Sequence, residues 1–298
     1  MIKIIFYPLL AALTVTSALA QEAVSLSGPD GVVLKAWHYK PLHDKLENGS
    51  VVRKPVVVAL HGCGGLYSTG GARNGKPNTR HHAMGQMLAG QGYHTVFPDS
   101  FGSRGVPSIC GQAQQPKNGV QIGIDERRAD TLAVQTWVRA QPWADAQHIA
   151  LLGWSHGAMT LLASTDRQNA QIKAAGAPFR AAIAFYPGCV NADKAGYRPN
   201  TPLTLLLGAD DDWTLPEPCI RMADRLKRAG DDVSLTVYPD AVHDFDTPLP
   251  GIRTRSDVPS RRPGAAAGEG VKVGQNPAAR EDSWRQVREI LKKAFAVD

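Results

Sequence analysis

The residues with the clearest chemical potential lie at positions 153–157, which read GWSHG and directly follow the run HIALL at 148–152. A strand that ends in G-x-S-x-G and continues into a helix makes a tight turn, the nucleophile elbow, which presents the serine hydroxyl above a sheet. A pattern with only three fixed positions matches many unrelated chains, and Ser155 could also be an ordinary helix N-cap. Ser155 is therefore a candidate nucleophile only if the chain also supplies a base, an acid and donors for an oxyanion.

Candidates for the acid and the base follow Ser155 in the order that this turn requires, Ser, then Asp or Glu, then His, each after a strand. One apolar run ends in Gly208 and is followed by Asp210, Asp211 and Asp212, and the next run is followed by His243. We predict His243 as the base. We prefer Asp211 as the acid, because three residues after Gly208 the chain has left the strand and can turn inward. The other two aspartates, a solvated loop or a helix cap remain alternatives.

A glycine-rich loop at 61–65, HGCGG, follows the apolar run 55–60 and is the candidate oxyanion loop. Glycines let the backbone approach a substrate closely. We expect one donor to be the backbone N–H of Cys63 and the other that of His156, the residue after the nucleophile. His61 is a possible second base, but we expect it to shape the loop.

Elements that could position these residues alternate along the chain. We expect strands at 23–26, 32–39, 55–60, 93–97, 148–154, 181–186, 203–207 and 233–238, and helices at 80–89, 125–140, 216–229 and from 276–277 onward. The helix at 125–140 carries Ala129, Leu132, Ala133 and Trp137 on one face. This alternation predicts a mostly parallel sheet of about eight strands with helices on both faces. Together with the elbow at 153–157, it predicts an α/β-hydrolase fold.

The segment 247–276 is rich in proline, glycine and arginine, and we predict a long irregular loop there. Such loops inside a compact domain are usually functional or disordered. Arginines at 253, 255, 261 and 262 leave two readings open, a lid that attracts anionic substrates or a surface loop.

The first twenty residues have the features of a signal peptide. Lys3 precedes the apolar stretch 4–15, and residues 18–20 read ALA, a cleavage site of the A-x-A type. A membrane anchor is the alternative, but the apolar stretch is shorter than the roughly 20 residues that span a bilayer. We therefore predict an exported protein, periplasmic or extracellular, with residues 21–298 as a single domain and no membrane span after cleavage.

The net charge of +6 is modest and spread along the chain, so nucleic-acid binding has no support. His81 and His82 are adjacent on a predicted helix and do not face one site, and no carboxylate-rich motif accompanies them or His94. We predict no metal and no cofactor.

Four cysteines in an exported chain predict two disulfides, and three pairings are possible. We favour Cys189 with Cys219, because both should follow adjacent strands at the same sheet edge. That choice leaves Cys63 with Cys110. Free buried thiols are the alternative.

With these residues in place, the chain resembles the dienelactone hydrolase family of α/β-hydrolases. The matching stretches are HGCGG, FPDSFGSRG, GWSHG, GADDDW and YPDAVHDF, between about residues 55 and 250. The resemblance implies an eight-stranded fold with a site for a small-molecule ester or lactone.

Three departures concern the substrate. Members proper of the family use cysteine where this chain has Ser155, and glutamate where it has His61. Members that bind a substrate carboxylate use two arginines: Arg104 is the candidate for one, and Thr247 stands near the place of the other. We predict a serine hydrolase that cleaves carboxylic esters or lactones through an acyl-enzyme. The alternatives are an inactive secreted binding protein or a peptidase on the same fold.

Overall fold

The computed structural model describes residues 21–42, 49–111 and 122–296. The predicted signal peptide, residues 1–20, lies outside the described residues. Within the described ranges, no helix has the length and apolar composition needed to cross a membrane.

Eight of the strands form one sheet in the order β1-β2-β4-β3-β5-β6-β7-β8. They are β1 (Gln21–Ser27), β2 (Val33–Tyr39), β3 (Lys54–Leu60), β4 (His94–Pro98), β5 (Ala144–Trp154), β6 (Ala182–Phe185), β7 (Leu203–Gly208) and β8 (Val233–Tyr238). The β1–β2 and β2–β4 pairs are antiparallel, and every other pair in this sheet is parallel. The expected mostly parallel sheet of about eight strands is confirmed.

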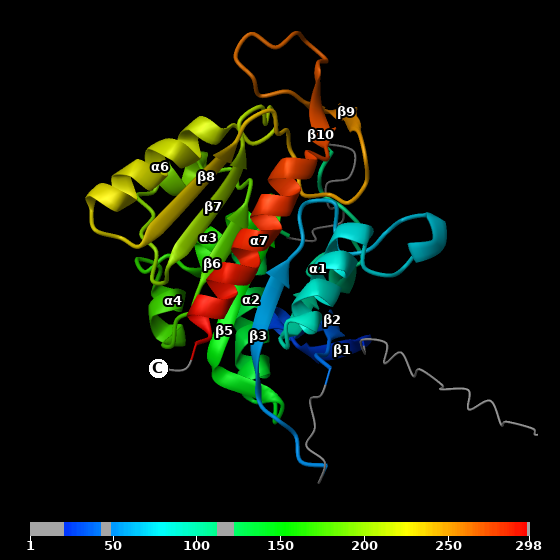
Figure 1. The fold of residues 1–298 in the computed structure, drawn as a ribbon, viewed down its shortest axis with the longest axis vertical. Helices are drawn as coiled ribbons and strands as arrows, with labels where there is room; N and C mark the ends of the chain where they lie inside the picture. Colours follow the sequence, from blue (N-terminus) through cyan, green and yellow to red (C-terminus); the bar gives the residue numbers. More distant parts are fainter. Residues whose placement is uncertain (1–20, 43–48, 112–121, 297–298) are drawn as a thin grey trace, which may run out of the picture.

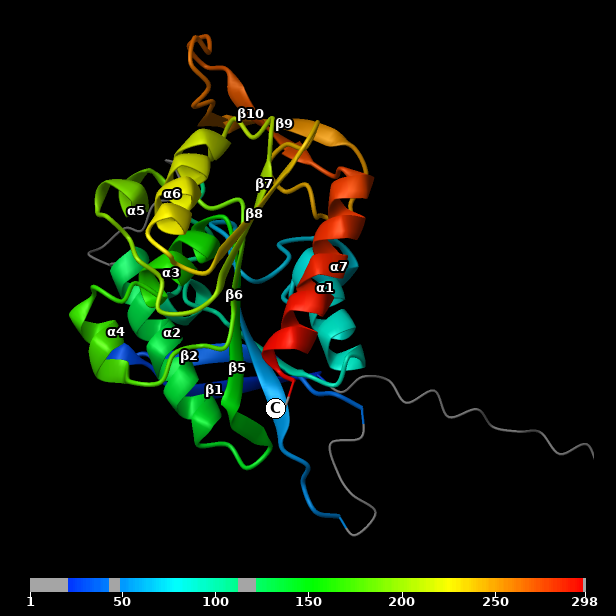
Figure 2. The same cartoon turned by 60° about the vertical axis from the view of Figure 1, so that its left-hand side comes forward.

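Helices cover both faces of the sheet, which is why its central strands are mostly apolar. Helices α1 (Thr79–Gly90) and α7 (Pro277–Ala294) lie on one face, as Figure 2 shows. The other face carries α2 (Ile124–Arg139), α3 (His156–Ser164), α4 (Ala170–Ala175), α5 (Val190–Lys194) and α6 (Pro216–Arg228) (Figures 1 and 2). Short 3-10 turns stand at Pro29–Gly31, Gly71–Arg73 and Gly102–Arg104.

Each face of the sheet has its own hydrophobic core. Leu161 of α3 and Met222 of α6 pack with alternate residues of the strands on one side, and Leu88 of α1 and Val287 of α7 do so on the other. The starts of the helices follow local chemistry: the Asn276 side chain accepts the N–H of Ala279 at 3.0 Å, and Pro277 occupies the first turn of α7.

The buried face of α2 differs from the expected one. The predicted apolar residues are half-buried, whereas the face turned to the sheet carries Arg127, Asp130, Thr131, Val134 and Val138. Ala133 and Trp137 pack only against the margin of the core. A helix that buries an arginine and an aspartate cannot be oriented from its apolar residues alone.

The prediction of an irregular loop at 247–276 was wrong. Strands β9 (Ile252–Pro259) and β10 (Gly270–Gly274) pair there as an antiparallel hairpin, which lies beyond the carboxyl end of the large sheet (Figure 1). The buried apolar side chains of the hairpin are Val258, Val271 and Val273, which pack near Trp213. Because so few of its residues enter a core, the segment lacks the apolar run by which the other strands were found.

Both disulfides form in the favoured pairs, Cys63 with Cys110 and Cys189 with Cys219. Cys63, Cys110 and Cys189 line one cavity, and Cys219 is fully buried in the core. The first disulfide ties the glycine-rich loop after β3 to the segment after β4.

Candidate active site

Ser155 occupies the turn between β5 and α3, with φ 50° and ψ −117°. Non-glycine residues rarely adopt a positive φ, and such strain is often found at functional sites. The two glycines of the motif permit the turn. A Cβ at Gly153 would lie 2.6 Å from the Gly157 carbonyl oxygen, and one at Gly157 would lie 2.1 Å from that of Leu60. The turn is thus held against β3, with the Ser155 side chain at the end of the sheet.

A continuous chain of hydrogen bonds joins Ser155 to His243 and Asp211. Ser155 Oγ is 3.0 Å from His243 Nε2, and His243 Nδ1 is 2.7 Å from Asp211 Oδ2. All three residues are buried, with exposures of 8%, 1% and 2%. This arrangement can move the hydroxyl proton of Ser155 to the imidazole while the carboxylate holds the ring.

The three consecutive aspartates have three different environments. Asp211 Oδ1 accepts the backbone N–H groups of Trp213 at 2.9 Å and Thr214 at 2.8 Å, which turns Oδ2 toward His243. Asp212 points to the hairpin, where its Oδ1 accepts the N–H of Lys272 at 2.9 Å. Asp210 is exposed. Only Asp211 is in contact with the candidate base.

The loops that carry Asp211 and His243 meet because Gly208 has no side chain. A Cβ there would lie 2.3 Å from the carbonyl oxygen of Ala241. The Asp210 N–H donates to the same carbonyl at 3.0 Å, so the loop after β7 is bonded to the loop after β8. The hairpin adds a further tie, since the N–H of Gly274 donates to the carbonyl of His243 at 2.9 Å.

Several side chains around His243 were not found from the sequence. The Thr214 hydroxyl is 2.9 Å from Asp211 Oδ2, and the rings of Tyr186 and Trp213 pack against the imidazole at centroid distances of 4.6 and 4.7 Å. On the far side of the base loop, Arg80 of α1 forms an ion pair with Asp244 at 2.6 Å. The only signal for this last contact was the acidic residue directly after His243.

Opposing effects set the pKa of His243. Burial disfavours the charged imidazolium and lowers the pKa, but the charge and hydrogen bond of Asp211, helped by Asp244, outweigh burial and raise it above the usual histidine value. The ring is thereby made a stronger base than a buried histidine without a carboxylate partner.

A cavity of about 600 Å³ opens at Ser155. Its walls are formed by residues from the elbow, both disulfides, the loop after β7 and the hairpin, namely Cys63, Ile109, Cys110, Ser155, His156, Met159, Gly188, Cys189, Val190, Asn191, Trp213, Thr214, Leu215 and Arg261. Apolar side chains and sulfurs dominate this list, and Arg261 is its one residue with a permanent charge. The cavity has the size and the mixed lining usual for a small-molecule site.

The two candidate oxyanion donors line this cavity with Ser155. A Cβ at Gly62 would lie 3.6 Å from Ser155 Cβ, which places the glycine-rich loop directly beside the serine. The N–H of His156 is at the first position of α3, where a helix offers no acceptor. Within the described ranges, the backbone N–H of Cys63, which lies in a loop, donates to no backbone carbonyl. Among the described residues, neither group therefore has a backbone partner that would compete with a ligand.

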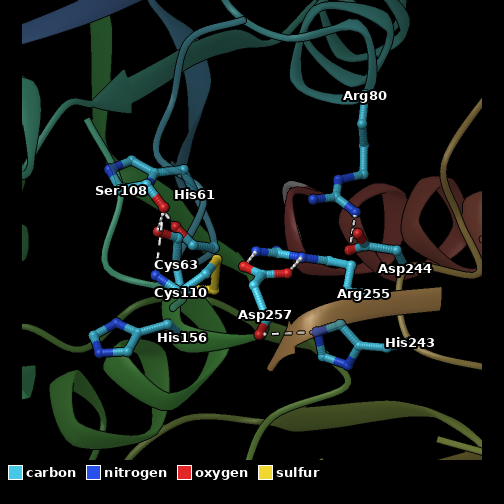
Figure 3. The surroundings of a disulfide bond; sticks show 12 residues. His61, Cys63, Arg80, Ser108, Cys110, His156, His243, Asp244, Arg255 and Asp257 are labelled. Atoms are coloured by element: carbon cyan, nitrogen blue, oxygen red, sulfur yellow. Dashed lines mark hydrogen bonds and ion pairs between the residues drawn. A yellow bond between two sulfur atoms is a disulfide. The ribbon is translucent and has the colours of Figure 1, made fainter. Parts of the chain in front are cut away.

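The Cys63–Cys110 disulfide forms a wall of the site, with His156 and His243 in its surroundings (Figure 3). The carbonyl of Cys63 accepts the N–H of Ile109 at 2.9 Å, which reinforces the tie between the two segments. Figure 3 also shows Arg255 and Asp257 of β9 near the disulfide; the Arg255 guanidinium lies over Trp213, at 5.1 Å from the ring centre.

The structure does not support Arg104 as a substrate-binding residue. Its guanidinium nitrogens donate to both carboxylate oxygens of Asp130 at 2.8 Å, and NH1 also donates to the Ser100 carbonyl. The side chain is 8% exposed and does not line the cavity. Arg104 therefore fastens the segment after β4 to α2, and Thr247, the residue near the second expected arginine position, is buried.

The three histidines considered as metal ligands, His81, His82 and His94, have other partners. His81 packs against Trp154 in the core, His82 bonds the Tyr39 hydroxyl at 3.0 Å, and His94 bonds His38 at 2.9 Å. In the part of the chain that the structure describes, no three His, Cys, Asp or Glu residues are grouped to hold a metal ion.

The doubly wound sheet, the elbow after β5 and the Ser–His–Asp contact define the class of α/β-hydrolases. The chain belongs to the dienelactone hydrolase family, which it matches over residues 46–295.

Solved structures of related proteins agree with this assignment of the fold. A putative dienelactone hydrolase from Klebsiella pneumoniae is 18% identical, with a TM-score of 0.63 over 92% of this chain and 99% of that one. A dienelactone hydrolase-like promiscuous phosphotriesterase, P91, from metagenomic libraries is 22% identical, with a TM-score of 0.63 over 93% and 100%. Esterase 2 of Thermogutta terrifontis, phosphorylated by paraoxon, is 18% identical, with a TM-score of 0.60 over 92% and 94%. The family supports a hydrolase of ester-type substrates, and these neighbours support the fold.

Proposed function

We propose that this protein is a serine hydrolase that cleaves carboxylic esters or lactones of small molecules through an acyl-enzyme. The observation that carries the proposal is the hydrogen-bonded chain from Ser155 through His243 to Asp211, which opens on the cavity. A binding protein without activity has no use for a strained serine that contacts a buried imidazole and carboxylate. No described feature favours a peptidase.

In the proposed reaction, Ser155 Oγ attacks the carbonyl carbon while His243 Nε2 takes the hydroxyl proton. Asp211 stabilises the resulting imidazolium, and the N–H groups of Cys63 and His156 bind the oxyanion. The C–O bond to the alcohol then breaks, and His243 returns its proton to the alcohol oxygen. Water, deprotonated by His243, attacks the acyl-enzyme and releases the acid by the same steps. A lactone gives one product, because its alcohol and acid stay joined.

We further propose that residues 21–298 act as a single exported domain after removal of residues 1–20. Two disulfides support this location, because such bonds persist in oxidising compartments and are rare in the cytosol.

A substrate screen tests the proposed function. We expect p-nitrophenyl esters of short acids and simple lactones to be hydrolysed with kcat/KM above that for the phosphotriester paraoxon, and peptide p-nitroanilides to remain intact. A fluorophosphonate probe in the same samples reports whether Ser155 is reactive. A folded protein that hydrolyses no ester or lactone and takes up no probe would contradict the proposal and favour the inactive binding protein.

The pH dependence of kcat/KM should show the ionisation of His243. The base must be neutral, so activity falls as pH decreases through the raised pKa of His243, above the ordinary value of about 6.5. In Asp211→Asn, burial still lowers this pKa but the carboxylate no longer raises it, so the acidic limb should move to lower pH. Profiles measured from about pH 5 to 9 check both statements. An unmoved acidic limb in the variant would show that another group controls it.

A further inference from the structure

Arg127 of α2 is a buried arginine with an unusual set of partners. It is 1% exposed, and within the described ranges no carboxylate lies in ion-pair distance of its guanidinium. Its two terminal nitrogens instead donate to uncharged acceptors: NH1 to Nδ1 of His156 at 2.7 Å, and NH2 to the carbonyl of His61 at 2.7 Å. Its remaining face lies over the ring of Phe101, 4.9 Å from the centroid.

These two acceptors belong to the two halves of the proposed oxyanion site. His61 begins the glycine-rich loop that carries Cys63, and His156 follows the nucleophile in the elbow. The guanidinium of Arg127 thus connects the glycine-rich loop to the start of α3. We propose that Arg127 is a positioning residue that fixes the two backbone oxyanion donors relative to each other and adds its positive charge to the site. The inference rests on the proposed function, because an oxyanion must form at Ser155.

The contact with Arg127 also fixes the protonation of His156. A guanidinium has donors and no acceptor, so Nδ1 of His156 must carry a lone pair. Burial and then the charge of Arg127 lower the pKa of His156 to about 3, so the ring is neutral at physiological pH. A neutral imidazole with unprotonated Nδ1 has its proton on Nε2. The ring of His156 therefore carries a fixed hydrogen-bond donor at Nε2, while Nδ1 stays bound to Arg127.

Holding a guanidinium in this place is costly for the resting protein. Burial lowers the pKa of Arg127 to about 9, although the carboxylates of Asp130 and Asp99 favour its charge. A buried cation without a contacting carboxylate leaves much of its field uncompensated. The positive charge of Arg127 should stabilise the negative charge that develops on the substrate carbonyl oxygen in the transition state. It should stabilise the neutral substrate less, and such a difference is what accelerates the chemical step.

The test compares Arg127→Met with Arg127→Lys and with a matched control. Methionine keeps much of the volume and removes the charge and both hydrogen bonds. Lysine keeps the charge but not the planar fork that reaches both acceptors. Arg198→Met is the control, because Arg198 pairs with Asp231 next to the amino end of β8, away from the cavity. Each variant is assayed for kcat and KM on a p-nitrophenyl ester and for inhibition by a trifluoromethyl ketone, whose adduct with serine carries an oxyanion.

We expect Arg127→Met to lower kcat by about 100-fold, as loss of an oxyanion donor does, with KM changed less than about threefold. The inhibition constant of the ketone should rise by a similar factor, Arg127→Lys should recover part of both losses, and the control should behave as the wild type. Equal ketone inhibition in wild type and Arg127→Met, or a loss confined to KM, would overturn the inference.

Nitrogen NMR of the wild type provides a test that needs no stable variant. Nε2 of His156 should be protonated and Nδ1 unprotonated at neutral pH. A cationic ring, or one protonated at Nδ1, would overturn the inference. Failure of the proposed function is distinguishable, since the wild type would then take up no fluorophosphonate, whereas failure of the Arg127 inference leaves a labelled and active wild type.

Discussion

Ser155→Ala should lower kcat for a short activated ester by about 10⁴-fold or more, with the fold intact. Alanine keeps the Cβ and lacks only the attacking oxygen. It inherits the same positive φ, and the glycines that make room for the turn are unchanged. Residual hydrolysis would come from oxyanion stabilisation and substrate binding without a covalent intermediate.

The matched control is Ser164→Ala, which removes another buried hydroxyl, at the far end of the helix α3 that follows Ser155. The kcat of Ser164→Ala should stay within about twofold of the wild type. The Ser164 hydroxyl is at the opposite end of α3 from Ser155 and does not line the cavity. Circular dichroism of both variants establishes that they are folded. Turnover by folded Ser155→Ala at the wild-type rate would contradict the assignment of the nucleophile.

Asp211→Asn should lower kcat by about 10³- to 10⁴-fold, the second largest effect that we expect. The amide can still accept the N–H groups of Trp213 and Thr214, so the loop after β7 keeps its shape. The neutral amide no longer stabilises the imidazolium, and it can hold His243 in the wrong tautomer. Comparison of kcat for the variant and the wild type at the pH optimum of each measures the effect.

The neighbouring aspartates serve as controls for this prediction. Asp210→Ala should leave kcat within about twofold of the wild type, because the side chain is exposed. Asp212→Ala removes the acceptor for the N–H of Lys272 and should loosen the hairpin, with a loss of about tenfold or less. A larger defect in either control than in Asp211→Asn would reassign the acid.

The sequence predicted the parts of the molecule whose local chemistry is self-contained. The elbow was recognisable because its glycines are required by contacts within a few residues or with the adjacent strand, such as Gly157 against Leu60. The position of Asp211 followed from its distance beyond the strand end. Apolar runs located the eight strands of the large sheet because most of those strands are buried on both faces.

The parts that escaped prediction depend on contacts distant in the chain. Arg127 stands in the polar stretch DERRAD, which resembles an exposed helix surface, and its acceptors lie 29 and 66 residues away. Arg104 matched a family position by sequence, but its partner, Asp130, is 26 residues away on α2. The hairpin of β9 and β10 was missed because it has only a small apolar cluster, and hydrogen bonds to Asp212 and His243 help to hold it in place.

Mass spectrometry of the protein during turnover tests the central claim most directly. The wild type is quenched in acid while it hydrolyses a p-nitrophenyl ester and is then digested. We predict that the acyl mass is found on the peptide that contains Ser155, and that Asp211→Asn and Ser155→Ala show a reduced adduct and none, respectively. An acyl group on another residue, or an adduct that persists in Ser155→Ala, would contradict the proposed acyl-enzyme.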